Sequence, residues 1–203
     1  MARIAILDYG MGNLRSVRHA VERVGGSPSV VDKPDEAARA DAAIVPGVGA
    51  FGACMRGLVR TGLDAAVREM AADGRPVLGV CLGMQVLFSS SEEDEDPGLG
   101  LIPGAVRRLD AAPGVKVPHM GWNEVRWTAD HPLTRGIPSG TRFYFVHSYA
   151  PDVTEGVTVG ATTHGREFGS AVASGSLFAT QFHPERSGDA GLALYEAFVK
   201  EVA

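Results

Sequence analysis

A cysteine stands between two glycines in the segment Gly79–Gly83, where an apolar run passes into a stretch with helical spacing. This Gly-x-Cys-x-Gly pattern is typical of a nucleophile elbow, the sharp strand-to-helix turn that exposes a reactive side chain. Glycines two residues before and after the cysteine let the turn tighten without a clash. The N–H groups at the start of the helix favour the thiolate form of Cys81. We therefore expect Cys81 to be a nucleophile, although burial as a small apolar residue is the commoner fate of cysteine.

The second cysteine, Cys54, lies in a helical stretch with no glycine elbow around it. We expect it to be a buried structural residue. Two cysteines in a chain of 203 residues do not make a disulfide framework, and no Cys/His cluster has zinc-site spacing. Thiol chemistry with a Cys-His pair requires neither a metal nor an organic cofactor, and we expect none.

A thiolate nucleophile needs a base that can later act as an acid, and histidine usually serves. His183 follows directly after the apolar run that ends at Thr180, on the sheet edge where α/β proteins build their sites. Glu185 could orient this imidazole and stabilise its cation. A His-Pro-Glu sequence alone is equally compatible with a plain loop; together with the elbow it predicts a Cys-His-Glu triad. Three other histidines stand in contexts typical of surface positions: His19, His131 and His164.

The elements that position these residues follow a βαβ rhythm in the first part of the chain. Apolar runs predict strands at residues 4–7, 30–31, 42–45 and 76–80, and helical spacing predicts helices over 14–24 and from Cys81 to Phe88. Such alternation is typical of a parallel sheet with helices on its faces.

The rhythm changes after the acidic stretch Glu92–Pro97. Short strands at residues 142–146 and 176–180 predict a mixed or antiparallel extension of the sheet. Apolar residues from Gly188 to Val202 recur in helical register and predict a closing helix. The acidic stretch could be a binding tail, but its position between a helix and a turn favours a solvated loop. We interpret residues 1–203 as a single α/β domain.

The composition excludes several classes of protein. With 24 acidic and 19 basic side chains and a net charge of −5, the chain offers no strong positive field for nucleic acid. Its apolar runs are strand-sized, far below the roughly 18 residues of a membrane span. The N-terminus Met1–Ile4 enters a strand without the apolar core of a signal peptide. These features favour a cytoplasmic protein with reduced thiols, bound to neither membrane nor nucleic acid.

Several motifs resemble those of one protein family. The elbow Gly79–Gln85 with His183–Glu185 resembles the class I (triad) glutamine amidotransferases, which have a flavodoxin-like α/β fold. More narrowly, further motifs resemble the glutaminase subunits of imidazole glycerol phosphate synthase. These are Asp8–Leu14, Pro46–Phe51, Gly98–Gly104, Pro118–Asn123 and Tyr144–Tyr149. The resemblance extends from Ala2 to the final helix.

The resemblance implies a mechanism and a set of site residues. Cys81 would attack the carboxamide of glutamine and form a γ-glutamyl thioester, while His183 would protonate the departing ammonia and then activate water. The oxyanion would be held by the backbone of Leu82 and by the loop containing Val48 and Gly49, where a peptide flip is expected in the family. The residues implied in glutamine binding are Gln85, Gly47, Ser148 and Tyr149.

The resemblance also implies a partner. A glutaminase of this type forms a heterodimer with a cyclase subunit of (β/α)8 fold and delivers ammonia to it for histidine biosynthesis. The positions that would face this cyclase subunit are Asn13, Trp122, Tyr144 and Arg186. The family often has lysine where this chain has Arg186. Trp122 and Tyr144 could alternatively be core aromatics.

Three rival functions remain open at the level of sequence. The chain could be a glutaminase that serves another synthase, a free-standing thiol hydrolase of γ-glutamyl compounds, or a binding module that has lost the chemistry. The motifs Asp8–Leu14 and Pro118–Asn123 argue against the first. The intact Cys81, His183 and Glu185 argue against the last.

Overall fold

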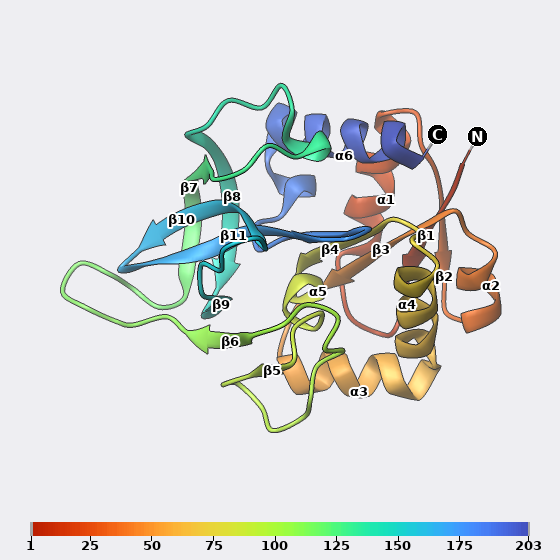
Figure 1. Ribbon diagram of the computed structural model, residues 1–203, viewed down its shortest axis with the longest axis horizontal. Helices are drawn as coiled ribbons and strands as arrows, with labels where there is room; N and C mark the ends of the chain where they lie inside the picture. Colours follow the sequence, from red (N-terminus) through yellow and green to blue (C-terminus); the bar gives the residue numbers. More distant parts are fainter. Residues whose placement is uncertain (1, 203) are drawn as a thin grey trace.

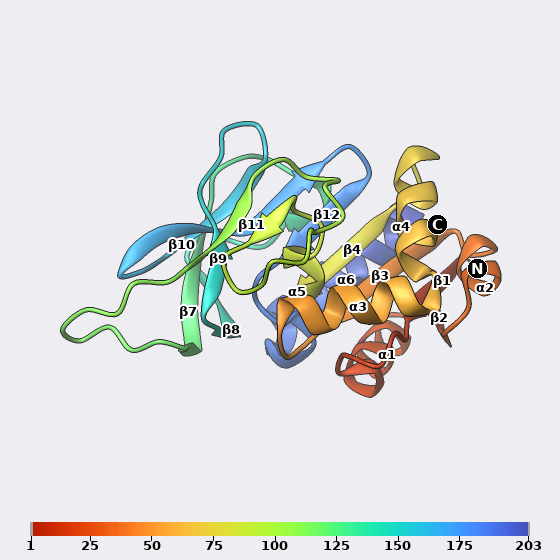
Figure 2. The ribbon, with the colours of Figure 1, turned by 90° about the horizontal axis from the view of Figure 1, so that it is seen from below.

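A large mixed sheet lies at the centre of the structure, a computed structural model that describes residues 2–202. Its strands are β1 (Arg3–Leu7), β2 (Ser27–Val31), β3 (Ala42–Gly47), β4 (Val77–Cys81), β7 (His119–Trp127), β8 (Thr141–His147), β10 (Thr158–His164), β11 (Arg166–Ser174) and β12 (Leu177–Thr180). Their order is β2-β1-β3-β4-β12-β11-β10-β7-β8 (Figures 1 and 2). The strands from β2 to β12 in this order are parallel, and those beyond β12 are antiparallel. The predicted parallel sheet with an antiparallel extension is confirmed.

Helices cover both faces of the parallel half of the sheet (Figures 1 and 2). They are α1 (Leu14–Arg23), α2 (Pro34–Ala38), α3 (Phe51–Thr61), α4 (Leu63–Ala72), α5 (Leu82–Gln85) and α6 (Gly188–Val202), with 3-10 turns at Pro132–Thr134 and Pro184–Arg186. Helices α1 and α6 lie on one face and α2 to α5 on the other. Within residues 2–202, none of these helices has the length and apolar character needed to cross a membrane.

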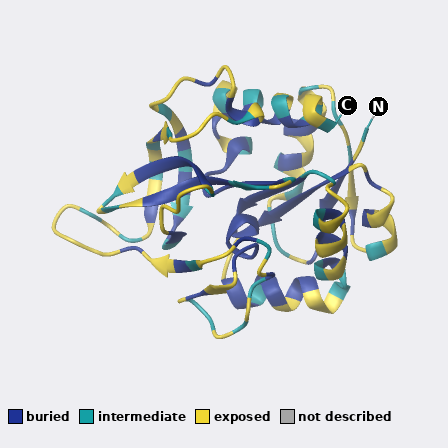
Figure 3. Cartoon of the chain, viewed as in Figure 1, coloured by how far each residue is buried: buried dark blue, intermediate teal, exposed yellow. Residues whose placement is uncertain are grey.

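The strands separate two apolar cores. In β1, Ile4 and Ile6 pack toward α1 and α6, whereas Ala5 and Leu7 pack toward the opposite helices. This alternation follows from the two-residue period of a strand, and a strand buried on both faces therefore has a continuous apolar sequence. Figure 3 shows the central strands as buried along their length, with the exposed residues on the outer helices and loops. The closing helix predicted from Gly188 to Val202 is confirmed as α6.

The predicted helix from Cys81 to Phe88 is wrong in its extent, because α5 ends at Gln85. The carbonyl oxygens that follow are taken by another segment of the chain. Val86 O accepts a hydrogen bond from Leu99 N at 2.7 Å, and Phe88 O accepts one from Gly100 N at 3.0 Å. A long-range backbone pairing thus replaces the continuation of the helix that the local spacing favours. A small sheet of β5 (Ser90–Ser91), β6 (Ala105–Arg108) and β9 (Tyr149–Pro151) follows.

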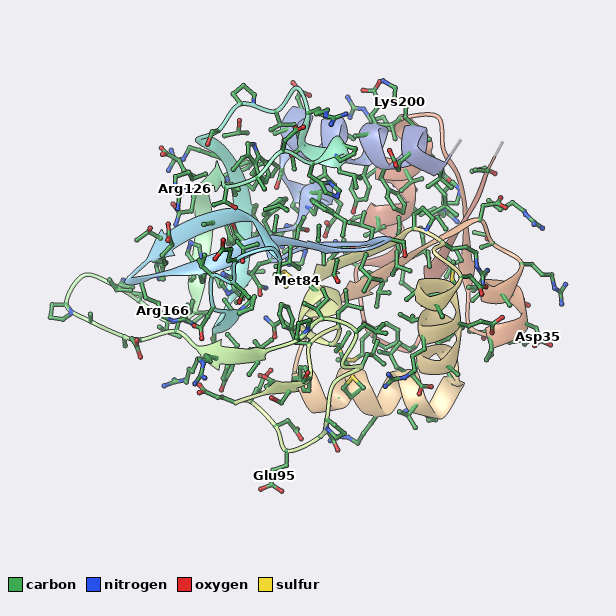
Figure 4. All side chains as sticks on the ribbon, in the orientation of Figure 1. Asp35, Met84, Glu95, Arg126, Arg166 and Lys200 are labelled. Carbon is green, nitrogen blue, oxygen red and sulfur yellow. The ribbon has the colours of Figure 1, made fainter. Side chains whose placement is uncertain are left out.

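The acidic stretch Glu92–Pro97 is a loop, and part of it is anchored to α3. Glu93 Oε2 accepts a hydrogen bond from Phe51 N at 2.9 Å, and Asp96 pairs with Arg56 at 2.5 Å. A carboxylate at the first N–H of a helix satisfies an otherwise free donor and complements the helix dipole. In Figure 4, Glu95 projects from the tip of this loop, whereas Met84 of α5 lies in the middle of the molecule.

Candidate active site

The nucleophile elbow is present at the end of β4. Cys81 has φ +55° and ψ −110°, and it is the one non-glycine residue with positive φ in the described part of the chain. A Cβ on Gly83 would collide with the carbonyl oxygen of Val45, and one on Gly79 would lie 2.7 Å from the carbonyl oxygen of Gly83. The two glycines therefore let α5 approach β3 and β4 closely enough to form the turn. Strained backbone of this kind costs about 1–3 kcal/mol and is concentrated at functional sites.

His183 lies beyond the end of β12 and is hydrogen-bonded to Glu185. His183 Nδ1 lies 2.8 Å from Glu185 Oε1, and the two side chains are 5% and 1% exposed. Burial by itself lowers the pKa of His183, but the neighbouring Cys81 thiol and the Glu185 carboxylate outweigh it and raise the pKa to about 10. His183 Nε2 is buried and has no hydrogen-bond partner among the described residues. Glu185 thus fixes one ring nitrogen and leaves the other for the pocket.

The backbone of His183 is held by β8. His183 N donates to Tyr144 O at 2.9 Å, and Ser187 Oγ donates to His183 O at 2.6 Å. Ser187 Oγ in turn accepts a hydrogen bond from Tyr144 N at 3.0 Å. Because the N–H and the carbonyl oxygen of His183 are both hydrogen-bonded, the backbone that carries the imidazole is held in place beside β8.

Most of the residues that the sequence predicts for the site line one cavity of about 300 Å³. It is lined by Val48, Gly49, Cys81, Leu82, Gln85, Glu93, Pro118, Val146, His147, Ser148, Tyr149 and His183. Gly47 lies in β3 directly beside Cys81, and Glu185 lies behind His183. The structure thus brings together the residues expected in catalysis, oxyanion binding and glutamine binding. A cavity of this size can accommodate a small, amino-acid-sized ligand.

The loop after β3 is held from behind by Tyr9 and Cys54. The Tyr9 hydroxyl donates to the carbonyl oxygen of Pro46, and Cys54 Sγ lies 3.8 Å from the carbonyl oxygen of Val48. Gly49 has φ +95°, which glycine adopts without strain. Cys54 is buried, as expected, and burial raises the pKa of its thiol to about 11. It therefore remains a protonated structural thiol.

Gln85 is the central polar residue of the cavity floor. Its Nε2 donates to Tyr149 O at 2.9 Å and to Gln181 Oε1 at 3.0 Å, while its buried Oε1 has no partner among residues 2–202. Gln181 Nε2 in turn lies 3.7 Å from Cys81 Sγ. Gln181 stands two residues before His183, just beyond the end of β12, and no motif in the sequence marked it as a site residue.

The four residues expected to face a partner are at the surface or near it. Trp122 is 50% exposed, and its ring meets that of Tyr144 at a centroid distance of 6.2 Å. The Arg186 guanidinium lies 4.2 Å from the Tyr144 ring centre, and Asn13 is exposed before α1, which contacts the turn containing Arg186. Neither Trp122 nor Tyr144 is a core aromatic, so that alternative is wrong.

Two of the three histidines expected at the surface, His131 and His164, are partly buried. His19 is exposed, but His131 stacks on Phe178 and His164 stacks on His119. His119 and His147, which no feature of the sequence marked for a separate role, are hydrogen-bonded to each other beside the cavity. These two histidines are 28 residues apart, and only the pairing of β7 with β8 places them opposite each other.

The fold, the elbow and the His-Glu pair define a class of protein. The family model "Glutamine amidotransferase class-I" matches residues 5–202, and the chain belongs to this family. Among curated proteins it is 53% identical to the imidazole glycerol phosphate synthase subunit HisH of Moorella thermoacetica, over 98% of this chain and 94% of that protein. It is 50% identical to the HisH subunit of Mycolicibacterium paratuberculosis, over 98% of both chains.

Solved structures agree on the fold. The chain superposes on the structure of PurLQS from Thermotoga maritima with a TM-score of 0.76 and 24% identity, over 100% of both chains. The glutaminase domain of CTPS from Trypanosoma brucei gives a TM-score of 0.73 at 19% identity, over 100% of this chain and 93% of that one. These structural similarities show the fold alone. The HisH subunits with 50% and 53% identity show the narrower group within the family.

Proposed function

We propose that this protein is the glutaminase subunit of an imidazole glycerol phosphate synthase. It hydrolyses L-glutamine to glutamate and ammonia and delivers the ammonia to a cyclase subunit in histidine biosynthesis. The observation that carries the proposal is the elbow cysteine Cys81 facing the same cavity as the Glu185-bound His183. The identity to HisH subunits over nearly the whole chain supports the choice of synthase.

In the proposed mechanism, Cys81 Sγ attacks the carboxamide carbon of glutamine. The C–N bond breaks as His183 gives its proton to the leaving nitrogen, so ammonia departs and a γ-glutamyl thioester remains. His183, now neutral, takes a proton from water, whose oxygen attacks the thioester and releases glutamate. The raised pKa of His183, about 10, supports this role because it supplies the proton for the first step at neutral pH.

Each tetrahedral intermediate carries a negative oxygen that requires N–H donors. The N–H of Leu82 is the first of α5 and has no acceptor within its helix. The loop of Val48 and Gly49 lines the same cavity and would supply a second donor after a peptide rotation. Loss of one such donor typically lowers the rate about 10²–10³-fold.

Glutamine recognition is proposed for Gln85, Gly47, Ser148 and Tyr149. The buried Oε1 of Gln85 has no protein donor among the described residues and would accept from the α-ammonium group of glutamine. The backbone of Ser148 and Tyr149 lines the same cavity beside Gln85 and would bind the α-carboxylate. These contacts hold the end of the substrate remote from the reacting carboxamide.

The proposed partner is a cyclase subunit of (β/α)8 fold that forms a heterodimer with this chain. Trp122, Tyr144 and Arg186 form an exposed aromatic and cationic group on β7, β8 and the turn after β12. Aromatic and arginine side chains contribute most of the binding energy at many interfaces. The backbone of His183 is hydrogen-bonded to Tyr144, which belongs to this surface, and to Ser187. A partner bound there would therefore lie close to the site that releases ammonia.

The test is glutamate release by the purified chain, alone and with the cyclase subunit of the same organism, with and without the nucleotide ligand of the cyclase. We expect activity that rises steeply with the partner and its ligand and that disappears in Cys81→Ala and His183→Ala. Equal activity without a partner would favour a free-standing hydrolase. Retention of activity in either variant would refute the triad.

A further inference from the structure

Two buried histidines form a hydrogen-bonded chain behind one wall of the cavity. His147 Nδ1 lies 2.9 Å from Tyr149 O, and His119 Nδ1 lies 2.9 Å from His147 Nε2. Asn123 Nδ2 lies 3.2 Å from His119 Nε2. The two imidazoles are 4% and 6% exposed, so solvent does not compete for these contacts.

The partners at the two ends determine where every proton lies. A carbonyl oxygen only accepts, so His147 donates to Tyr149 O from Nδ1. At the other end the Asn123 amide donates to His119 Nε2, so His119 carries its proton on Nδ1 and donates it to His147 Nε2, which accepts. The orientation of that amide is fixed independently, because its Nδ2 donates to Thr163 O at 3.0 Å and its Oδ1 accepts from Glu124 N at 2.8 Å. The chain is therefore satisfied only with both imidazoles neutral and protonated at Nδ1.

The last acceptor of the chain belongs to the cavity wall. Tyr149 O receives hydrogen bonds from both His147 Nδ1 and Gln85 Nε2, and Ser148 O receives one from Leu109 N at 2.8 Å. The carbonyl groups on both sides of the Ser148–Tyr149 peptide bond are thus held by protein donors. This peptide is the part of the wall to which the proposed function assigns the α-carboxylate of glutamine.

The same two strands carry the exposed aromatic residues on their other face. In the β7–β8 register His119 is opposite His147, and Trp122 is opposite Tyr144. Because side chains alternate across a strand, the histidines point inward and the aromatic pair points outward. A displacement of β7 relative to β8 would therefore change the histidine contact as well as the outer surface.

We propose that His119 and His147 are positioning residues that set the Ser148–Tyr149 backbone for glutamine binding through a neutral, Nδ1-protonated relay anchored at Asn123. This inference rests on the proposed function for the substrate and on the hydrogen-bond geometry for the relay. Burial lowers the pKa of His119 to about 4, with a smaller contribution from the nearby His164, and burial lowers the pKa of His147 to about 3. The titratable groups that face His147 are His119, His164 and His183, and protonation of any of them would lower the pKa of His147 further.

The test combines kinetics of the complex with direct detection of the tautomers. In the complex with the ligand-bound cyclase, His119→Leu should raise KM for glutamine about tenfold, the usual effect of losing one hydrogen bond, with kcat within about twofold. His119→Asn should restore most of the affinity, because its amide can donate from the place of Nδ1. His164→Leu removes an imidazole that stacks on His119 outside the relay, at a centroid distance of 4.1 Å, and should leave KM unchanged.

Nitrogen-15 NMR of the wild-type chain at neutral pH should show His119 and His147 as Nδ1–H tautomers. This measurement requires no variant to fold and no substrate to bind. An Nε2–H tautomer or an imidazolium form at either position would overturn the relay. An unchanged KM in a folded His119→Leu, or an equal rise in His164→Leu, would overturn the positioning role. Failure of the wild-type complex to hydrolyse glutamine would instead refute the proposed function, and the tautomers would still test the relay.

Discussion

Burial of His147 makes the stability of this protein sensitive to acid. Burial lowers the pKa of this imidazole to about 3 in the folded state, against an ordinary value of about 6.5 in the unfolded chain. As the pH falls below about 6.5, the unfolded chain binds a proton that folded His147 does not. Stability is therefore complete above that pH and is lost as the pH falls toward the folded-state value.

The magnitude follows from the width of this window. A pH of about 5 lies about 1.5 units below the pKa of the imidazole in the unfolded chain, and each pH unit corresponds to about 1.36 kcal/mol. The folded form stays neutral there, so His147 lowers the free energy of unfolding by about 2 kcal/mol between pH 7 and pH 5. His119 acts in the same direction, because burial lowers its pKa to about 4.

Urea unfolding of the wild type and of His147→Gln at both pH values measures this effect. The other titratable groups, including His183, are present in both proteins, so the difference between the two pH dependences reports mainly on His147. We expect the wild type to lose about 2 kcal/mol more than His147→Gln on acidification. The control His19→Gln removes an exposed histidine and should lose as much as the wild type. Equal losses in wild type and His147→Gln would refute the reasoning.

Three further predictions concern the elbow, the triad and the partner surface. Gly83→Ala forces a Cβ against the Val45 carbonyl and should lower the free energy of unfolding by about 1–3 kcal/mol or more in urea titrations; an unchanged midpoint would contradict the packing argument. Glu185→Gln should lower kcat for glutamate release about 10²–10⁴-fold with KM little changed, because the amide no longer stabilises the His183 cation; a loss confined to KM would count against the triad. Trp122→Ala should weaken binding of the cyclase subunit about 30-fold in calorimetry without affecting folding, and unaltered affinity would remove Trp122 from the interface.

Much of the fold could be predicted because its cause is local. A strand buried on both faces needs an unbroken apolar run, and a helix packed on one side needs apolar residues with a helical period. The sequence therefore predicts β1, β3, β4 and α6. It does not predict the end of α5, because residues from Leu99 onward supply the backbone donors that replace the helix. The sequence of the helical segment alone does not show that hydrogen bonds from a distant segment will replace those of the helix.

The candidate site divides in the same way. The sequence by itself predicted the candidate nucleophile and its base, because an elbow needs glycines at fixed offsets from Cys81 and because His183 and Glu185 are two residues apart. Only the tertiary structure decided that Gln85 would meet Gln181, 96 residues away, or that His119 would lie within hydrogen-bond distance of His147 across two strands. Sequence spacing specifies contacts within one turn of backbone, whereas these contacts depend on the register and order of strands that the whole apolar core sets.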